Sequence, residues 1–270
     1  MSGPFLEVRD LTAAFTTRGQ TVQVLNGLNF DMAAGESVGF VGESGSGKSV
    51  MARAIMQLAP EGSSIRLGGS VLFQGQDLLA YDETRMRDIR GSRIAMVFQD
   101  PMTSLNPVMT IGAQIDDMVR RHTGLSAAAA RDRTLDLLDR VGIRDARRRA
   151  DDHPHQFSGG MRQRVMIAMA ISCEPDLLIA DEPTTALDVT VEAQILRLLM
   201  RLREDLGMAL MLITHDFGVI AGMVERVNVM YRGDIVEDGP VERIFHAPEH
   251  DYTRALLKAV PRLHETESRT

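Results

Sequence analysis

The sequence predicts an α/β fold in which the strands of a buried parallel sheet alternate with helices. Short apolar runs such as Leu177–Ala180 and Met208–Ile213 are typical of strands covered on both faces. A glycine-rich stretch at 42–49 follows the apolar run Ser37–Val41 and precedes a helical pattern, which gives the order strand, loop, helix. From Thr110 to Val141 the apolar spacing is helical without a strand between, which predicts an inserted helical subdomain.

Composition and charge narrow the class of protein. The 270 residues, 44% of them hydrophobic, suffice for one large domain or a domain with a subdomain. The net charge of −7 disfavours a protein that binds nucleic acid. Cys173 is the only cysteine, which excludes a disulfide framework and a cysteine-based metal site. No apolar run has the length of a membrane span, so work at a membrane would require docking to another protein.

The chain begins with two predicted strands, 5–17 and 22–32, around a turn at 18–20. Phe15 lies in the first strand. An aromatic ring ahead of a phosphate-binding loop can stack on adenine, but a phenylalanine in a strand is more often part of the core. From the residue alone both interpretations stay open.

The glycine-rich stretch has the composition that phosphate binding requires. It consists of Gly42, Glu43, Ser44, Gly45, Ser46, Gly47, Lys48 and Ser49, followed by Val50 in the helix. Glycines let successive backbone N–H groups point inward at an anion, and the helix N-terminus adds partial positive charge. Lys48 can reach the β- and γ-phosphates, and the Ser49 hydroxyl can bind Mg²⁺. The alternative is a flexible turn without a ligand, which the flanking strand and helix disfavour.

The next stretch leads to a candidate glutamine. A strand is expected at 71–73, a polar helix at 82–90 and a buried strand at 94–98. Gln99 follows this last strand. A glutamine in such a place can ligate a metal ion, orient a water molecule or make local hydrogen bonds in a loop.

The helical stretches carry clear capping signals. Ile111, Ile115, Met118 and Val119 share one helical face. Ser126 is placed to cap a second helix, and Ser158 a long helix through Ile171. Gly159 and Gly160 in the first turn of that long helix cost stability. This cost indicates a close approach to another group, for which we expect an anion at the helix N-terminus.

Polar residues also end two buried strands. Asp181 and Glu182 close the run from Leu177. In a phosphate-loop protein the first carboxylate holds Mg²⁺, and the second is placed to polarise an attacking water. His215 follows the run 208–213 and can hydrogen-bond a phosphate or have only a structural role. A helix is expected at 191–206 between the two strands.

The C-terminal part has local elements only. We expect a hairpin of the strands 227–231 and 233–237, then short helices at 241–245 and 252–260. The last ten residues are polar and are expected to be frayed.

Together these stretches resemble the ATP-binding cassette (ABC) ATPases. Gly42–Ser49 resembles the phosphate loop, Gln99 the glutamine loop, Ser158–Gln163 the signature sequence, Leu177–Glu182 the second nucleotide motif, Ala186–Asp188 the aspartate loop, and His215 the switch histidine. The resemblance implies a P-loop NTPase core of RecA-like fold, with an antiparallel β subdomain and an α-helical subdomain inserted at about 105–172. It implies an ATPase domain at 1–240, a helical tail at 241–270, and stacking of Phe15 on adenine.

A narrower resemblance concerns three stretches, Asp100–Pro107, Thr184–Thr190 and His250–Leu257, which are similar to the bacterial dipeptide, oligopeptide and nickel importers. Asp251 departs from the usual His-Pro-Tyr of that subfamily. No cysteine follows Cys173, so we expect no iron–sulfur cluster. The resemblance implies the ATP-hydrolysing subunit of a peptide importer. A nickel or metal-chelate importer is the alternative, and a non-transport ABC protein is a further one.

The resemblance also implies roles for the candidate residues. Two cassettes would pair head to tail around two ATP molecules with Mg²⁺. The phosphate loop of one chain would face Ser158, Gly159, Gly160 and Gln163 of the other, and Asp188 would contact the opposite loop. Ser49, Gln99 and Asp181 would hold Mg²⁺, Glu182 would be the general base, and His215 would bridge the γ-phosphate.

The implied partners follow from the same resemblance. They are a second ABC ATPase subunit that is a different chain, two transmembrane permease subunits and, indirectly, an extracytoplasmic substrate-binding protein. The protein would lie peripherally on the cytoplasmic face of the bacterial inner membrane, and no nucleic acid is expected to bind.

Overall fold

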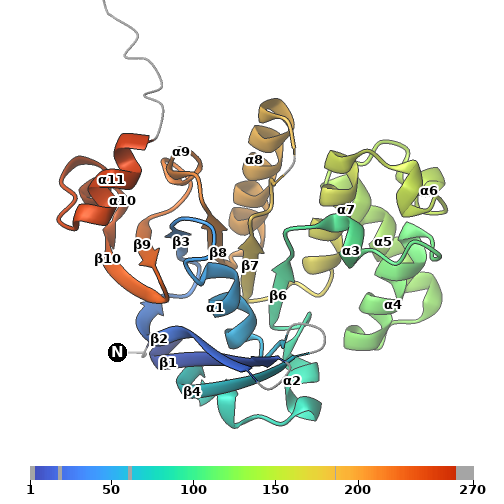
Figure 1. Cartoon of the computed structure of the whole chain (residues 1–270). Coiled ribbons are helices and arrows are strands. Elements are labelled where there is room, and N and C mark those ends of the chain that lie inside the picture. The colour runs from blue at the N-terminus through green and yellow to red at the C-terminus, as the bar shows by residue number, and fades with distance from the viewer. Residues whose placement is uncertain (1–3, 18–19, 60–62, 186, 260–270) are drawn as a thin grey trace, which may run out of the picture.

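The computed structural model describes residues 4–17, 20–59, 63–185 and 187–259. These residues form two β-sheets, with helices between and beside them (Figure 1). The first two residues of the expected turn at 18–20, Ala186 of the aspartate loop and the last ten residues lie outside the described residues.

The central sheet has six strands in the order β10-β9-β3-β8-β7-β6. The strands are β3 (Ser37–Val41), β6 (Ile94–Val97), β7 (Leu177–Asp181), β8 (Ala209–Thr214), β9 (Arg226–Tyr231) and β10 (Asp234–Pro240). All neighbours pair in parallel except β9 and β10, which form the predicted antiparallel hairpin. Every residue of β3, β7 and β8 is buried, which confirms the prediction made from their apolar runs.

Strand register brings the candidate polar residues to one edge of this sheet. Val41 lies opposite Thr214, and Asp181 lies opposite Ile213. The glycine loop, Glu182 and His215 therefore follow the carboxyl ends of three adjacent parallel strands, where ligands of open α/β sheets bind.

A second, antiparallel sheet has the order β2-β1-β4-β5. Its strands are β1 (Leu6–Thr17), β2 (Gln20–Met32), β4 (Ser64–Phe73) and β5 (Gln76–Asp77). β4 is much longer than the predicted 71–73 because its first half is partly exposed and lacks the apolar run of a buried strand. Helix α1 (Lys48–Ile55) joins the two sheets through one hydrophobic cluster that includes Met51 and Ile55 (Figure 1).

The helices agree with the capping signals. They are α2 (Glu83–Ile89), α3 (Pro101–Ser104), α4 (Ile111–Thr123), α5 (Ala127–Arg140), α6 (Ala146–Arg149), α7 (Gly159–Ala170), α8 (Val189–Leu206), α9 (Phe217–Ile220), α10 (Val241–His246) and α11 (Asp251–Ala259), with 3₁₀ helices at Leu78–Ala80 and Pro154–Gln156. Ser126 and Ser158 cap α5 and α7 as predicted. α8 begins two residues before the predicted 191 because Asp188 caps it.

Helices α3 to α7 lie together on one side of the central sheet (Figure 1). Ile111, Ile115 and Val119 of α4 are fully buried, whereas Met118 is only partly buried. One hydrophobic cluster runs from these helices into the central sheet, so the helical block is built on the sheet rather than around a separate core. No helix within the described residues is both long and apolar enough to cross a membrane.

Candidate nucleotide-binding site

The loop between β3 and α1 is shaped by backbone contacts that only glycine permits. A Cβ on Gly42 would lie 2.2 Å from the carbonyl oxygen of Met230 in β9. Gly47 has φ +105° where it caps α1. The amide of Gly233 donates to the carbonyl of Ser46 at 2.9 Å, so the β9–β10 hairpin holds the loop from outside.

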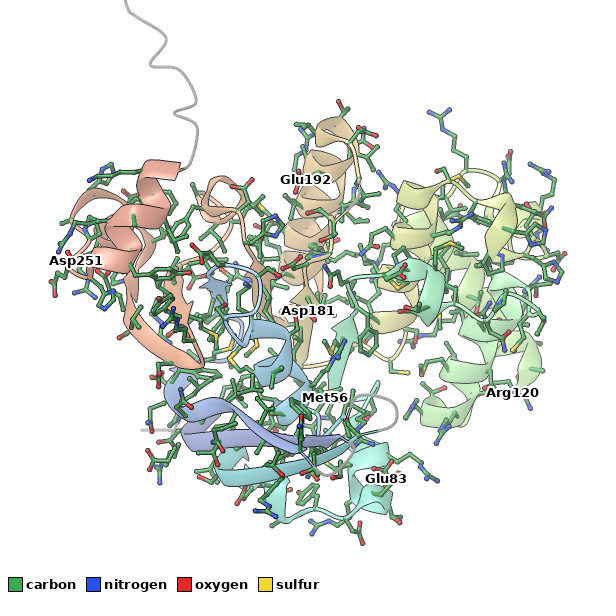
Figure 2. All side chains as sticks on the ribbon, viewed as in Figure 1. Met56, Glu83, Arg120, Asp181, Glu192 and Asp251 are labelled. Carbon is green, nitrogen blue, oxygen red and sulfur yellow. The ribbon has the colours of Figure 1, made fainter. Side chains whose placement is uncertain are left out.

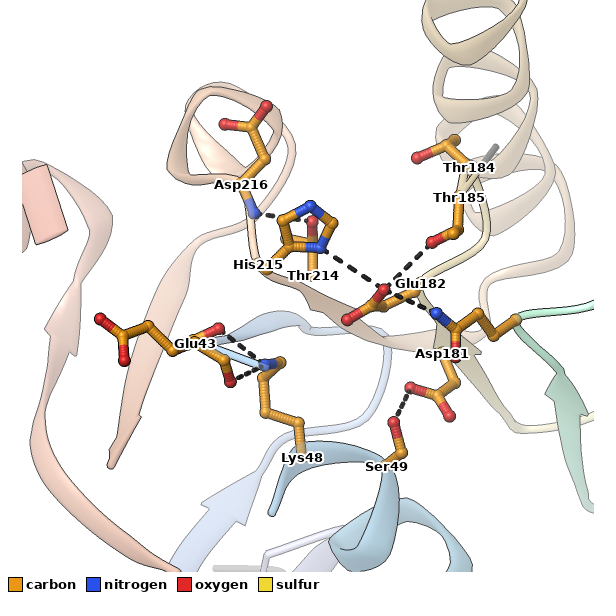
Figure 3. Close-up of polar contacts among 12 residues, drawn as sticks. Glu43, Lys48, Ser49, Asp181, Glu182, Thr184, Thr185, Thr214, His215 and Asp216 are labelled. Atoms are coloured by element: carbon orange, nitrogen blue, oxygen red, sulfur yellow. Dashed lines mark hydrogen bonds and ion pairs between the residues drawn. The ribbon is translucent and has the colours of Figure 1, made fainter. Parts of the chain in front are cut away.

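Lys48 is a buried cation whose two shortest hydrogen bonds are with carbonyl oxygens. Its side chain is 4% exposed, and Nζ donates to the carbonyls of Gly42 at 2.7 Å and Glu43 at 2.9 Å (Figure 3). Burial lowers the pKa of Lys48, although the nearby carboxylates of Glu182, Asp181 and Glu43 oppose that shift. Lys48 forms no ion pair among the described residues, so its charge is available to an anion in the loop.

Ser49 and Asp181 bring two oxygen groups together from different elements. The Ser49 hydroxyl at the start of α1 donates to Oδ1 of Asp181 at the end of β7, at 2.8 Å (Figure 3). Asp181 is 2% exposed, and burial raises its pKa, against the effect of the Ser49 hydrogen bond. A hydroxyl and a carboxylate are hard ligands of the kind that Mg²⁺ takes alongside phosphate oxygens and waters, so this pair fits that ion.

Glu182 gathers three side chains around one carboxylate oxygen. Its Oε2 accepts hydrogen bonds from Nε2 of Gln99 and Oγ1 of Thr185, each at 3.0 Å. Nδ1 of His215 lies 3.4 Å from the same oxygen (Figure 3). The Glu182 side chain is 13% exposed and that of His215 is 60% exposed, so the histidine forms the outer wall of this cluster.

The backbone of Glu182 explains how the carboxylate reaches its position. Glu182 has φ +45°, a left-handed conformation that is uncommon for a residue other than glycine. Its N–H donates to the carbonyl of Ile213 at 2.9 Å, which anchors the turn to β8. Backbone strain of this kind is concentrated at functional sites.

The hydrogen bonds of Gln99 and Thr185 to Glu182 were not predicted from the sequence. The described contacts join Gln99 to Glu182 rather than to the Ser49–Asp181 pair, so they give no support to Gln99 as a metal ligand. Thr185 did not emerge from the sequence as a site residue. The available signal was its position three residues after Glu182, in the loop that follows the two carboxylates.

The N-terminus of α7 shows why two glycines begin that helix. A Cβ on Gly160 would lie 2.6 Å from Cγ1 of Val191, and a Cβ on Gly159 would lie 3.5 Å from Cδ2 of Leu187. α7 therefore packs tightly against the start of α8 at Gly160. A contact within the chain therefore already requires a small residue at Gly160, and the anion expected at this helix N-terminus stays a prediction.

Two of the predicted nucleotide-contacting residues near the α7–α8 contact, Ser158 and Asp188, are exposed, whereas a third, Gln163, is buried. Ser158 and Asp188 are exposed while they cap α7 and α8 through the amides of Met161 and Val191. Gln163 is 2% exposed, and its Nε2 has no partner among the described residues. Its burial gives no support to the prediction that it contacts nucleotide.

The signature stretch and the phosphate loop do not meet within the chain. In Figure 1 α1 and α7 lie on opposite sides of β6, with α7 inside the helical block. Figure 2 shows Asp181 at the centre of the molecule, and Arg120 of α4 at the far end of the helical block. An exposed Ser158 so placed is open to a neighbouring molecule.

Phe15 and Val50 are only partly buried. Phe15 lies in β1 opposite Val22 of β2 and Ile65 of β4. Val50 lies in the first turn of α1. No ring stacks on Phe15 among the described residues, and the stacking of Phe15 on adenine stays a prediction.

The comparisons with known proteins agree with this geometry. The family profile described as ABC transporter matches residues 25–185, and the one described as the C-terminal region of oligopeptide/dipeptide transporters matches 236–270. The chain is 53% identical over 262 residues to a Brucella abortus protein named as a peptide import ATP-binding protein, covering 97% of this chain and 79% of the relative. It is 51% identical over 258 residues to the oligopeptide transport ATP-binding protein OppD of Bacillus subtilis, covering 96% and 72%.

Solved structures show the same architecture. The ATP-binding cassette MJ0796, solved as a dimer in a post-hydrolysis state with ADP and Pi, superimposes with a TM-score of 0.76 at 28% identity over 87% of this chain and 98% of that one. CbiO1 from Clostridium perfringens, part of the ABC transporter complex cbiONQ, gives a TM-score of 0.75 at 27% identity, covering 90% and 91%.

The fold and the site define an ATPase of the ATP-binding cassette class. The α/β fold class predicted from the sequence is thereby confirmed. The chain belongs to the ABC transporter family.

Proposed function

We propose that this protein is the ATP-hydrolysing subunit of a bacterial importer for di- and oligopeptides. The observation that carries the proposal is the meeting of Lys48, the Ser49–Asp181 pair and the Glu182 cluster at one edge of the central sheet. These groups supply a cation for phosphates, a metal-binding pair and a base. The relatives at 51–53% identity carry the names of peptide transport subunits, which favours peptides over the nickel alternative and over a non-transport role.

Each group has a task in the proposed hydrolysis of ATP. Lys48 and the loop amides bind the β- and γ-phosphates, and Phe15 stacks on adenine. Ser49 and Asp181 would hold Mg²⁺, which would supply positive charge to stabilise the phosphates. Glu182 accepts a proton from the attacking water, while Gln99, Thr185 and His215 orient its carboxylate. His215, the most exposed of these side chains, also reaches the γ-phosphate.

A second ABC ATPase chain completes the site in this proposal. The exposed Ser158 and Gly159 at the N-terminus of α7 face the nucleotide of a head-to-tail partner, with Asp188 against the partner's loop. We propose a different chain as that partner. Gln163 is left out of this contact set because it is buried.

A groove beside the helical block supports docking to a permease subunit. It is a cavity of about 520 Å³ between the end of α1, β6 and the helices α4 and α7. Its lining is rich in methionine: Met56, Met96, Met109, Met118, Met166 and Met169. Methionine side chains are flexible and adapt to an inserted apolar helix. Figure 2 shows Met56 at the lower end of α1.

We propose the remaining assignments on the same basis. Residues 1–240 are the ATPase domain with the helical subdomain at about 105–172, and 241–270 are the tail. Two permease subunits dock from the membrane, so that this subunit lies on the cytoplasmic face of the inner membrane. An extracytoplasmic binding protein delivers the peptide to the permeases.

Uptake measurements test this function. Deletion of the gene in the bacterium that encodes it should abolish uptake of radiolabelled di- and oligopeptides and leave ⁶³Ni²⁺ uptake intact. The wild-type gene should restore uptake, and a Glu182→Gln gene should not. Loss of nickel uptake with normal peptide uptake would contradict the peptide assignment while leaving the ATPase assignment in place.

A further inference from the structure

A tyrosine of the C-terminal helix contacts the phosphate loop. The hydroxyl of Tyr252, in the first turn of α11, accepts a hydrogen bond from the backbone amide of Glu43 at 3.0 Å, across 209 positions of sequence. Tyr252 lies within the region that matches the C-terminal region of oligopeptide/dipeptide transporters. Neither the phosphate-loop pattern nor the proposed mechanism gives this residue a task.

The contacted peptide bond is the one that also holds the lysine. The N–H of Glu43 and the carbonyl of Gly42 belong to a single planar unit, and in a trans peptide they point in opposite directions. The carbonyl accepts from Nζ of Lys48 at 2.7 Å, while the N–H donates to Tyr252. The peptide plane is therefore fixed on both sides, and rotation of this plane would break both hydrogen bonds at once.

Tyr252 is itself held firmly against the sheet edge. Its ring packs on Tyr231, the last residue of β9, with a centroid distance of 4.2 Å. The neighbouring Met230 supplies the carbonyl that excludes any side chain at Gly42. The Tyr231–Tyr252 pair and the phosphate loop therefore both contact the end of β9.

A buried carboxylate fixes the turn that leads into α11. Glu237 of β10 is 8% exposed and accepts the amides of Glu249 at 2.8 Å and His250 at 3.0 Å. Burial alone would raise the pKa of Glu237, but these hydrogen bonds, together with Thr253 and the positive charge of Arg243, outweigh burial and lower it. Figure 2 shows Asp251, the first residue of α11, on the side of the molecule formed by β9 and β10.

We propose that Tyr252 is a positioning residue of the nucleotide site. Its hydroxyl fixes the Gly42–Glu43 peptide, and this peptide sets the position from which Lys48 and the following loop amides meet the phosphates. The C-terminal segment thereby tunes the affinity for nucleotide. By linkage, bound nucleotide changes the surroundings of Tyr252 in return. This inference rests on the proposed binding of ATP.

The test compares two tyrosines that form one ring pair. In the full chain, Tyr252→Phe removes the hydroxyl and keeps the ring on Tyr231. We expect KM and Kd for MgATP to rise by about threefold to tenfold, the worth of one hydrogen bond, with kcat unchanged. Tyr231→Phe is the matched control, because no partner of the Tyr231 hydroxyl is found in the described part of the chain. We expect this variant to bind MgATP as the wild type does.

A spectroscopic signature separates positioning from simple anchoring of the helix. The chain has three tyrosines and no tryptophan, so 3-fluorotyrosine gives three ¹⁹F signals that the Tyr→Phe variants assign. We expect the Tyr252 signal to shift when MgADP binds, and the signal of the remote Tyr81 to stay in place.

The outcomes distinguish the inference from the proposed function. A wild-type chain that binds no MgATP overturns both. A wild type that binds while Tyr252→Phe has the same KM overturns the positioning role alone, even if its Tm falls, because a purely structural anchor would lower Tm without changing KM. The positioning role is also overturned if Tyr231→Phe loses as much affinity for MgATP as Tyr252→Phe, or if the ¹⁹F signal of Tyr252 does not shift when MgADP binds.

Discussion

Replacing Glu182 with glutamine tests the proposed base most directly, because the change removes a charge and almost no volume. Oε2 of Glu182 accepts from Gln99 and Thr185, and the amide oxygen of glutamine can accept the same two bonds. The local fold should therefore survive. The lost function is proton acceptance from water, which is worth about 10²–10⁴-fold in rate, or about 2.7–5.4 kcal/mol at 1.36 kcal/mol per factor of ten.

The binding of ATP should respond differently from its hydrolysis. The hydrogen bonds and ion pair of the Glu182 side chain are with Gln99, Thr185 and His215, not with Lys48 or the Ser49–Asp181 pair. Its negative charge nevertheless lies close enough to influence the pKa of Lys48. Removal of that charge should leave MgATP affinity unchanged or tighter. We expect Glu182→Gln to retain binding in a calorimetric titration and to lose phosphate release at saturating MgATP.

The control for this experiment is Glu204→Gln, which makes the same chemical change at an exposed position of α8. It should hydrolyse ATP at the wild-type rate. Turnover of Glu182→Gln within a factor of a few of wild type would refute the role of Glu182 as general base. Loss of both binding and turnover would instead assign Glu182 to nucleotide binding.

Three further predictions concern the loop, the helix contact and the tail. Lys48→Ala should weaken MgATP binding by about tenfold or more, because a charge-assisted hydrogen bond to phosphate is lost; an unchanged calorimetric Kd would count against the loop assignment. Gly160→Ala should destabilise the fold by about 1–3 kcal/mol through the clash with Val191, and Val191→Ala in the same chain should restore part of the Tm; an unchanged Tm in the single variant would contradict the packing argument. Glu237 has a pKa below its ordinary 4.5, so its carboxylate stabilises the fold above that pH, and this stabilisation is lost as the pH falls through the lowered value. The Tm of the wild type should therefore fall more steeply with acidification than that of Glu237→Gln. Parallel curves of Tm against pH for the two proteins would disprove this stabilising role of the Glu237 carboxylate.

Local patterns in the sequence predicted a large part of the fold. The buried runs became β3, β7 and β8 because a strand covered on both faces needs only apolar side chains in succession. Ser126 and Ser158 were recognised as caps because capping depends on residues within one helical turn. The half-exposed first part of β4 was missed, since it is stabilised by pairing with β1 rather than by its own apolar pattern.

The candidate site, too, was predicted from the sequence only in part. The sequence supplied the types of group, Lys48 in a glycine loop and carboxylates at a strand end. It could not supply Thr185 as a donor to Glu182, or the reason for Gly160, which depends on the packing of α7 against α8. The roles assigned to these residues in nucleotide binding stay predictions until the variants are measured.

What the sequence determined by itself is the chemistry that this chain can carry, because residue types, their order and their local spacing are properties of the chain alone. The tertiary structure decided which of those groups meet. It placed the Ser49 hydroxyl against Asp181, 132 positions away, and the Tyr252 hydroxyl against the amide of Glu43, 209 positions away. Such contacts follow from strand order, register and helix packing, which bring distant residues together through many weak interactions that no local pattern encodes.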